Sequence, residues 1–386
     1  MPIGAGTITP MKITGVTCHV LHAPIEHKFF YSQGYYPGRD AVLVEIRTDE
    51  GLTGWGQAAG APAAVPLLVE RQYAPRLLGK DPRDWNALWH VLGGLRGGHY
   101  GIISGLEIAL LDLAGQALGQ PVYRLLGGAV RDRVKVYATG LYRLERWRSL
   151  DAWREGLVEE ALGYRAAGFS LTKLKIGFVP REDIQLVHAV RDAIGPEMGL
   201  AVDANCAWDA ATAIGVGKAI ECATVAWYEE PLAPTDLEGY REVRRAVHIP
   251  ISGGESLAGL YPFRDLIATR SVDIVQPDII ICGGFAIMHR VQALADANHV
   301  RLLPHCWGSA LSLAASLHFL ATIPDGAPSI TPTEPLLEYD RSENPLRDAL
   351  LVDNLRQTGG YLPVPQGPGL GVTIDPDALE RYRVQP

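Results

Sequence analysis

Short apolar runs alternate with longer amphipathic segments from Val134 onward. Segments such as 181–194 and 286–298 have the length and apolar spacing of helices. Strands that alternate with helices indicate a parallel sheet, and eight such units predict an α/β fold with a (β/α)8-type (TIM-like) barrel. The candidate strands are VKVYAT (134–139), LTKLKI (171–176), GLAVD (199–203), VAWYE (225–229), PISGG (250–254), DIVQ (273–276), VRLLP (300–304) and residues 335–339.

The pattern before Val134 differs and predicts a separate α+β capping domain. Residues 11–60 resemble strands, with a hairpin signal that turns at 48–51, and residues 62–128 resemble helices. We therefore expect a capping domain over 11–130 and a barrel over 131–350. The Pro/Gly-rich segment 351–386 is expected to pack back on the capping domain. Residues 1–10 are small, polar and uncharged before Met11, which predicts a tail and not a secretory signal.

An aromatic segment lies between the first predicted strand and the hairpin. Residues 29–39 contain five aromatic side chains together with glycine and proline, a composition that suits a loop covering a site. The alternative is a loop that is simply anchored by its own aromatic rings.

Composition excludes several function classes. The net charge of −8, with no run of lysine and arginine, predicts no nucleic-acid partner. No apolar stretch approaches the length of a membrane helix, so we expect no membrane partner. The five cysteines are scattered and odd in number, which fits buried apolar residues in a reducing cytoplasm better than disulfides or zinc.

Lys173 and Lys175 are the first candidates for chemistry. They are two apart on a predicted strand, so their side chains share one face. Two neighbouring ammonium groups disfavour each other's charge, which predicts a lowered pKa for at least one of them. The alternative is a pair of lysines that protects an exposed strand edge.

Three acids recur at the ends of successive strands. Asp203, Glu229 and Glu255 are 26 and 26 residues apart, one strand–helix unit each. The carboxyl ends of barrel strands meet at one face, so these acids should converge. Three uncompensated carboxylates need a cation, and an all-oxygen shell suits Mg²⁺ best. Taken singly, each acid could instead be a helix cap or a loop ion pair.

The same spacing continues past the three acids. Lys175 lies 28 residues before Asp203, Asp278 lies 23 after Glu255, and His305 lies 27 after Asp278. Asp278 and His305 should cap adjacent strands, where the carboxylate would orient the imidazole and raise its pKa. Glu338 would close the ring from the eighth strand, unless it is a simple surface acid.

These motifs, in this order, resemble the enolase superfamily and its mandelate racemase subgroup. The shared features are Lys173-x-Lys175, Asp203-x-Asn205, Glu229-Glu230-Pro231, Gly253-Gly254-Glu255, Pro277-Asp278 and Pro304-His305, with Gly-x-x-Gly-Trp-Gly at 51–56. Secondary motifs around Cys282-Gly283-Gly284, Pro304-His305-Cys306-Trp307 and Leu337-Glu338-Tyr339 are similar to galactarolactone cycloisomerases and acid-sugar dehydratases. No lysine follows Asp278 at 279–284, unlike the muconate-lactonizing and dipeptide-epimerase branches.

The resemblance implies a role for each residue. Asp203, Glu229 and Glu255 match the Mg²⁺ ligands. Lys175 matches the base on one face, with Lys173 holding the substrate carboxylate, and Asp278 with His305 matches the dyad on the other face. Glu338 matches the acid that contacts the carboxylate. Asn205, Arg39 and Trp307 are further candidates for substrate binding, and a homo-oligomer is expected by resemblance alone.

The implied reaction is removal of the proton next to the carboxylate of a sugar acid or its lactone, giving an enediolate. β-Elimination would follow, as dehydration or as opening of a lactone ring. If His305 returned the proton, the result would be racemisation or epimerisation of a 2-hydroxy acid. A non-catalytic protein that binds carbohydrate acids is a further alternative. A phosphate-binding barrel fits less well, because its glycine pairs would follow strands 7 and 8, whereas here they follow strands 5 and 6.

Overall fold

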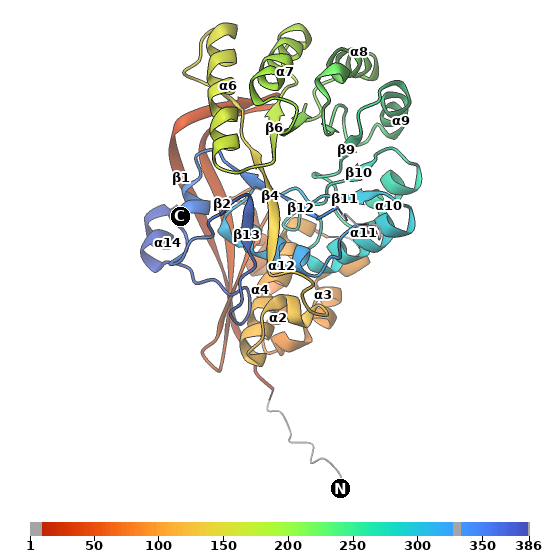
Figure 1. The fold of residues 1–386 in the computed structure, drawn as a ribbon. Coiled ribbons are helices and arrows are strands. Elements are labelled where there is room, and N and C mark those ends of the chain that lie inside the picture. Colours follow the sequence, from red (N-terminus) through yellow and green to blue (C-terminus); the bar gives the residue numbers. More distant parts are fainter. Residues whose placement is uncertain (1–9, 97, 327–332, 385–386) are drawn as a thin grey trace.

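Two sheets organise the chain in the computed structural model, which describes residues 10–96, 98–326 and 333–384. A four-stranded sheet comes mainly from the N-terminal part, and a nine-stranded, mainly parallel sheet comes from the remainder (Figure 1). Apart from Pro10, the predicted N-terminal tail lies outside the described residues.

The N-terminal sheet is antiparallel and contains the predicted hairpin. Its order is β3-β2-β1-β5. The strands are β1 (Ile13–Tyr31), β2 (Gly34–Thr48), β3 (Thr53–Ala58) and the short β5 (Arg143–Leu144), which joins from after the first barrel strand.

The aromatic segment 29–39 is not the predicted loop but the tip of a long hairpin. β1 and β2 continue through it, pairing Phe29 with Tyr36 and Phe30 with Tyr35. The ring centroids of these pairs lie 5.3 and 4.7 Å apart. Aromatic residues favour strands and stabilise each other across a ladder, which outweighs the turn tendency of Gly34, Pro37 and Gly38.

Helices cover this sheet, and glycines let the longest helix approach it closely. A Cβ on Gly56 of β3 would lie 2.0 Å from the carbonyl oxygen of Gly105 on α4, so only glycine fits. This packing explains part of the Gly-x-x-Gly-Trp-Gly motif. The helices are α1 (Val65–Leu68), α2 (Ala74–Leu77), α3 (Trp85–Leu92), α4 (Tyr100–Leu118) and α5 (Val122–Leu125), with a π turn at Val69–Tyr73 and 3₁₀ turns at Pro82–Asp84 and Gly94–Arg96.

The prediction that no apolar stretch approaches the length of a membrane helix is wrong for α4. By length and composition α4 could cross a bilayer, but 78% of its most apolar window is buried inside the protein. It is therefore a core helix, apolar over most of its surface because protein surrounds it.

All eight predicted barrel strands are present, in the order β11-β10-β9-β8-β7-β6-β4-β12. Within the described residues no ladder joins β11 to β12, so the barrel-like sheet stays open there. Pro304 and Pro335, which flank these edges, lack the N–H that a ladder needs. The strands are β4 (Arg133–Thr139), β6 (Leu171–Lys175), β7 (Gly199–Asp203), β8 (Tyr228–Glu229), β9 (Ile251–Gly253), β10 (Ile274–Val275), β11 (Arg301–Leu302) and β12 (Leu336–Asp340).

Helices between these strands follow one another in an arc around the parallel strands (Figure 1). The two segments singled out in the sequence, 181–194 and 286–298, correspond to α7 and α11. The helices are α6 (Leu150–Ala166), α7 (Pro180–Ile194), α8 (Ala210–Ile220) with a 3₁₀ turn at Glu221–Ala223, α9 (Leu237–Ala246), α10 (Leu260–Ala268), α11 (Phe285–Ala297), α12 (Ala310–Ala321) and α13 (Pro345–Asp348).

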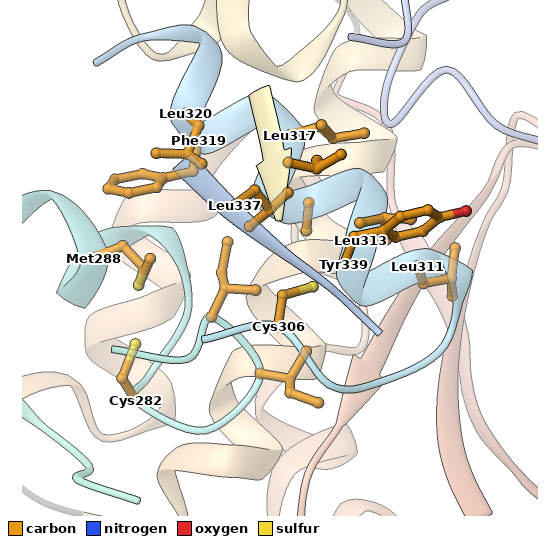
Figure 2. Packing of buried hydrophobic residues seen from close by; sticks show 14 of the residues in the cluster. Cys282, Met288, Cys306, Leu311, Leu313, Leu317, Phe319, Leu320, Leu337 and Tyr339 are labelled. Carbon is orange, nitrogen blue, oxygen red and sulfur yellow. The ribbon is translucent and has the colours of Figure 1, made fainter. Parts of the chain in front are cut away.

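Apolar side chains fill the space between α12 and β12. Leu313 and Leu317 of α12 lie against Leu337 and Tyr339 of β12, with Cys306 beside them (Figure 2). All five cysteines are free thiols, but only Cys282 and Cys306 are buried, so the expectation of mostly buried cysteines is wrong.

The C-terminal segment contacts both parts of the molecule. Its strand β13 (Tyr361–Pro363) pairs antiparallel with β4 of the barrel-like sheet. Its helix α14 (Pro376–Tyr382) contacts β1, and the Val384 amide donates to the Val20 carbonyl at 2.8 Å.

Candidate active site

Three acids meet at the carboxyl ends of β7, β8 and β9. Asp203 is the last residue of β7, Glu229 is the last residue of β8, and Glu255 lies two residues beyond β9. One carboxylate oxygen from each lies within 4.8 Å of one from each of the others. The spacing of one strand–helix unit therefore brings them together, because parallel strands end at a common edge.

The cluster carries more negative charge than its neighbours neutralise. Burial, with the charge of Asp203, raises the pKa of both Glu229 and Glu255 to about 7. Among the described residues Glu255 Oε2 is buried without a hydrogen-bond partner. An unsatisfied buried oxygen beside two further carboxylates fits a hard divalent cation, which takes oxygen ligands.

Lys173 lies under the cluster. Its side chain is fully buried, which excludes the exposed-edge alternative. Its ammonium group contacts Glu229, lies 2.9 Å from Glu338 Oε1, and lies 3.5 Å from Asp203 Oδ2. The predicted lowering of a lysine pKa is wrong here. Burial lowers the pKa of Lys173, but the charges of Glu229 and Glu338 outweigh it and raise the pKa well above its usual range.

Lys175 is two residues further along β6 and faces Asp203. Its ammonium group contacts Asp203 Oδ2 and lies 3.1 Å from Asn205 Oδ1. The ring of Tyr142 lies 5.6 Å away on another side. Burial lowers the pKa of Lys175 and Asp203 raises it, with a net rise. The repulsion between the two lysines is present but is smaller than the attraction of the carboxylates.

His305 and Asp278 form the predicted pair. Nδ1 of His305 lies 2.6 Å from Asp278 Oδ2, and Nε2 lies 3.5 Å from Glu255 Oε2. Burial lowers the pKa of His305, but Glu255, Glu338 and the hydrogen bond to Asp278 raise it to about 10. The predicted direction is confirmed, with Glu255 and Glu338 raising the pKa as well as Asp278.

Glu338 is a buried member of the site and not a surface acid. Its oxygens accept hydrogen bonds from Thr139 Oγ1 at 2.6 Å and from the Cys306 amide at 3.0 Å. Burial raises its pKa, but Lys173 and His305 outweigh this effect, so the pKa falls below the usual range. The ionised form of Glu338 is therefore favoured in these surroundings.

Arg39 and Trp307 lie against each other beside the site. The Arg39 guanidinium is 3.6 Å from the centre of the Trp307 ring and 2.8 Å from Asp340 Oδ2. Arg39 is thus held in a buried ion pair, and direct contact with a substrate stays a prediction for it. Nε1 of Trp307 has no hydrogen-bond partner in the described part of the chain, which leaves this donor available.

The hairpin tip, which the sequence did not connect to particular barrel residues, touches the same region. Ser32 Oγ donates to the Ala204 carbonyl at 2.7 Å, and Gln33 Nε2 donates to the Asn205 carbonyl at 2.6 Å. The turn of this hairpin therefore lies beside the residues that directly follow Asp203 in the same chain. The sequence carried no signal for this pairing, because it joins residues 172 apart through side-chain bonds.

Two families match the chain in sequence order. The N-terminal domain of mandelate racemase and muconate lactonizing enzyme matches residues 17–127, and the enolase C-terminal domain-like family matches residues 156–378. The chain therefore belongs to the mandelate racemase and muconate lactonizing enzyme family of the enolase superfamily, as its motifs predicted.

Individual relatives of the chain include cycloisomerases and an acid-sugar dehydratase. The chain is 38% identical over 380 residues to D-galactarolactone cycloisomerase of Agrobacterium fabrum, covering 97% of this chain and 99% of the relative. It matches 3,6-anhydro-D-galactonate cycloisomerase from Zobellia galactanivorans with a TM-score of 0.85 at 35% identity, covering 97% and 100%. An L-talarate/galactarate dehydratase variant liganded with Mg and L-glucarate gives a TM-score of 0.83 at 28% identity, covering 98% and 93%. The predicted resemblance to cycloisomerases and acid-sugar dehydratases is confirmed.

Proposed function

We propose that this enzyme removes the proton next to the carboxylate of a sugar acid or its lactone, with Mg²⁺ as cofactor, and then eliminates the β-oxygen. Opening of a ring is the first candidate, because two full-length relatives with 38% and 35% identity are cycloisomerases. Dehydration of an open-chain acid is the same elimination with hydroxide as the leaving group.

The observation that carries this proposal is the placement of two basic groups around the three acids. Lys175 contacts Asp203, and His305 Nε2 lies 3.5 Å from Glu255 Oε2. A substrate between them would meet one base and one acid. That arrangement suits removal of a proton and protonation of a leaving oxygen.

Charge balance supports a divalent cation at Asp203, Glu229 and Glu255. Such a cation, when bound, stabilises the negative charge that develops on the substrate carboxylate. One divalent charge would balance the ion-paired groups of the site, which are five carboxylates and three basic side chains: Asp203, Glu229, Glu255, Asp278 and Glu338 against Lys173, Lys175 and His305.

The chain's own residues would then divide the work. Lys175 takes the proton in its neutral form, which would be favoured when a cation shares the Asp203 charge that raises the Lys175 pKa. Lys173 holds the carboxylate with a fixed positive charge. His305, oriented by Asp278, protonates the leaving oxygen. Asn205 and Trp307 contact the substrate, Trp307 through its indole N–H, which has no hydrogen-bond partner among the residues that the structure describes. Glu338 holds Lys173 and the Cys306 amide in place.

A second candidate is racemisation or epimerisation of a 2-hydroxy acid. The same two basic groups favour it, because His305 could return a proton to the carbon from which Lys175 removed one. The remaining predictions are proposals as well: the division into 11–130, 131–350 and 351–386, closure of the (β/α)8 barrel, a homo-oligomer and a cytoplasmic location.

Proton exchange tests the proposal directly. The protein with Mg²⁺ is incubated in D₂O with a panel of sugar acids and lactones and followed by NMR. We expect deuterium next to the carboxylate of at least one compound, with an opened lactone or a 2-keto acid as product. Lys175→Met and His305→Asn should lose turnover, whereas Lys135→Met, a lysine of β4 outside the cluster, should not. An inverted epimer as sole product would favour racemisation, and the absence of exchange in Mg²⁺-binding protein would favour a binding role.

A further inference from the structure

The three acids of the cluster are held by different kinds of partner. Asp203 accepts hydrogen bonds from the Asn205 amide at 2.8 Å and from the Lys175 ammonium group. Glu255 Oε2 has no hydrogen-bond partner in the described ranges. Glu229 Oε2, in contrast, accepts two hydrogen bonds from neutral side chains, at 2.8 Å from Trp227 Nε1 and 2.8 Å from Gln276 Nε2.

These two donors reach Glu229 from positions beside different strands. Trp227 directly precedes β8, two residues before Glu229. Gln276 directly follows β10, which lies two strands away in the sheet order. Trp227 is 1% exposed and Gln276 is fully buried, so neither side chain has water as an alternative partner.

The consequence is a fixed rotation of the Glu229 carboxylate. With Oε2 occupied by two N–H donors, Oε1 is the oxygen turned toward Lys173, which it contacts. A ligand oxygen that is already oriented loses less entropy when a cation binds, and donors to the other oxygen set its direction.

We infer that Trp227 and Gln276 are positioning residues that orient Glu229 for a divalent cation at the Asp203–Glu229–Glu255 cluster. This inference rests on the proposed function, because it presupposes that the cluster binds Mg²⁺. Neither side chain would touch the substrate or the reacting atoms, so they act through Glu229 alone.

Tyr137 provides a matched control in the same buried cluster of side chains. Its ring packs edge-on against Trp227, with centroids 5.2 Å apart, and its hydroxyl has no hydrogen-bond partner among the described residues. Tyr137→Phe therefore changes a large buried aromatic residue beside Trp227 without removing any bond to Glu229.

The experiment measures Mg²⁺ binding to metal-free protein by calorimetry. We expect Trp227→Phe and Gln276→Met each to weaken Mg²⁺ binding by about 10-fold or more, the range found for lost outer-shell partners. Tyr137→Phe should bind as the wild type does. In turnover assays the Mg²⁺ concentration for half activation should rise in the two variants, while the rate at saturating Mg²⁺ stays close to the wild-type rate.

The outcomes distinguish a failure of the metal role from a failure of the positioning role. Failure of the wild type itself to bind Mg²⁺ would overturn the metal role in the proposed function. A wild type that binds Mg²⁺, with both variants binding equally well, would overturn the positioning role alone. Circular dichroism shows whether Trp227→Phe and Gln276→Met are folded. If one of them misfolds, the other still tests the positioning role. An equal loss in Tyr137→Phe would mean that packing, and not hydrogen bonding, controls the affinity.

Discussion

Two groups of fully buried carboxylates in this protein have opposite surroundings. At the ends of the barrel strands, Asp203 and Glu338 face lysine ammonium groups. On α4, Glu107 accepts a hydrogen bond from the Ala286 amide at the start of α11, and Asp112 accepts bonds from the Trp55 and Leu370 amides. The first group is surrounded by charge and the second by backbone dipoles.

Their pKa values differ accordingly. Lysine charges outweigh burial and lower the pKa of Asp203 and Glu338. Burial outweighs the backbone bonds and raises the pKa of Glu107 to about 8 and of Asp112 to about 6. Burial alone therefore does not mark a catalytic acid. The acids of α4 join segments of the chain, whereas Asp203 and Glu338 are kept ionised by the basic side chains that they contact.

Removal of the metal should have the largest effect, because it acts on the strand-end carboxylates and not on the acids of α4. With a chelator such as EDTA we expect activity to disappear, because the three basic side chains leave two of the five carboxylate charges unbalanced. Thermal stability should also fall, by about 2.7 kcal/mol if Mg²⁺ is present at 100 times its dissociation constant. Excess Mg²⁺ should restore both. Activity that persists after complete metal removal, verified by elemental analysis, would contradict the assignment.

Substitution of the base should have the next largest effect. Lys175→Met keeps the length of the side chain but removes the amine, and we expect the rate to fall by about 10²- to 10⁴-fold. The measurement is kcat on the substrate found in the exchange panel, with circular dichroism as a check of folding. Full activity of this variant would show that the proton is taken by another group.

The Asp112→Asn substitution probes the other group through stability. Each carboxylate oxygen of Asp112 accepts a different backbone amide, Leu370 at 2.7 Å and Trp55 at 2.9 Å. An asparagine presents its NH₂ group to one of these donors and leaves it unpaired, so we expect a loss of about 1–3 kcal/mol in urea denaturation. Turnover by the folded fraction should not change. A stability equal to wild type would mean that one of the two bonds contributes nothing.

Glu107→Gln should have the smallest effect, and its sign depends on pH. Because the folded pKa of Glu107 is raised to about 8, its contribution is fully present below the unfolded pKa and is lost as pH rises to about 8. Glutamine resembles the protonated acid, so below the unfolded pKa we expect a change under about 1 kcal/mol. Between pH 5.5 and 8.5 the urea midpoint of the wild type should fall relative to that of the variant. Parallel pH curves would show that Glu107 does not titrate in this range.

Sequence spacing predicted which acidic and basic side chains meet at the strand ends, because the strand–helix unit repeats at a nearly constant length. Asp203, Glu229 and Glu255 could be placed together because parallel strands of a barrel end at one edge, and a period near 26 residues returns the chain to that edge. The pairing of His305 with Asp278 followed from the same rule. The amphipathic periods also predicted α7 and α11 closely, since each needs only its own apolar face.

Interactions between distant side chains were decided by the tertiary structure alone. The raised lysine pKa values depend on which carboxylates lie nearest, and those come from three other strands. The contact of Gln33 with Asn205, and the two donors on Glu229, depend on sheet order and on how far a hairpin reaches, which no local pattern records. The sequence by itself determined which groups stand at the strand ends, because backbone periodicity is a local property. Charge state and orientation required the fold, because electrostatic and hydrogen-bond energies depend on distances across the sheet.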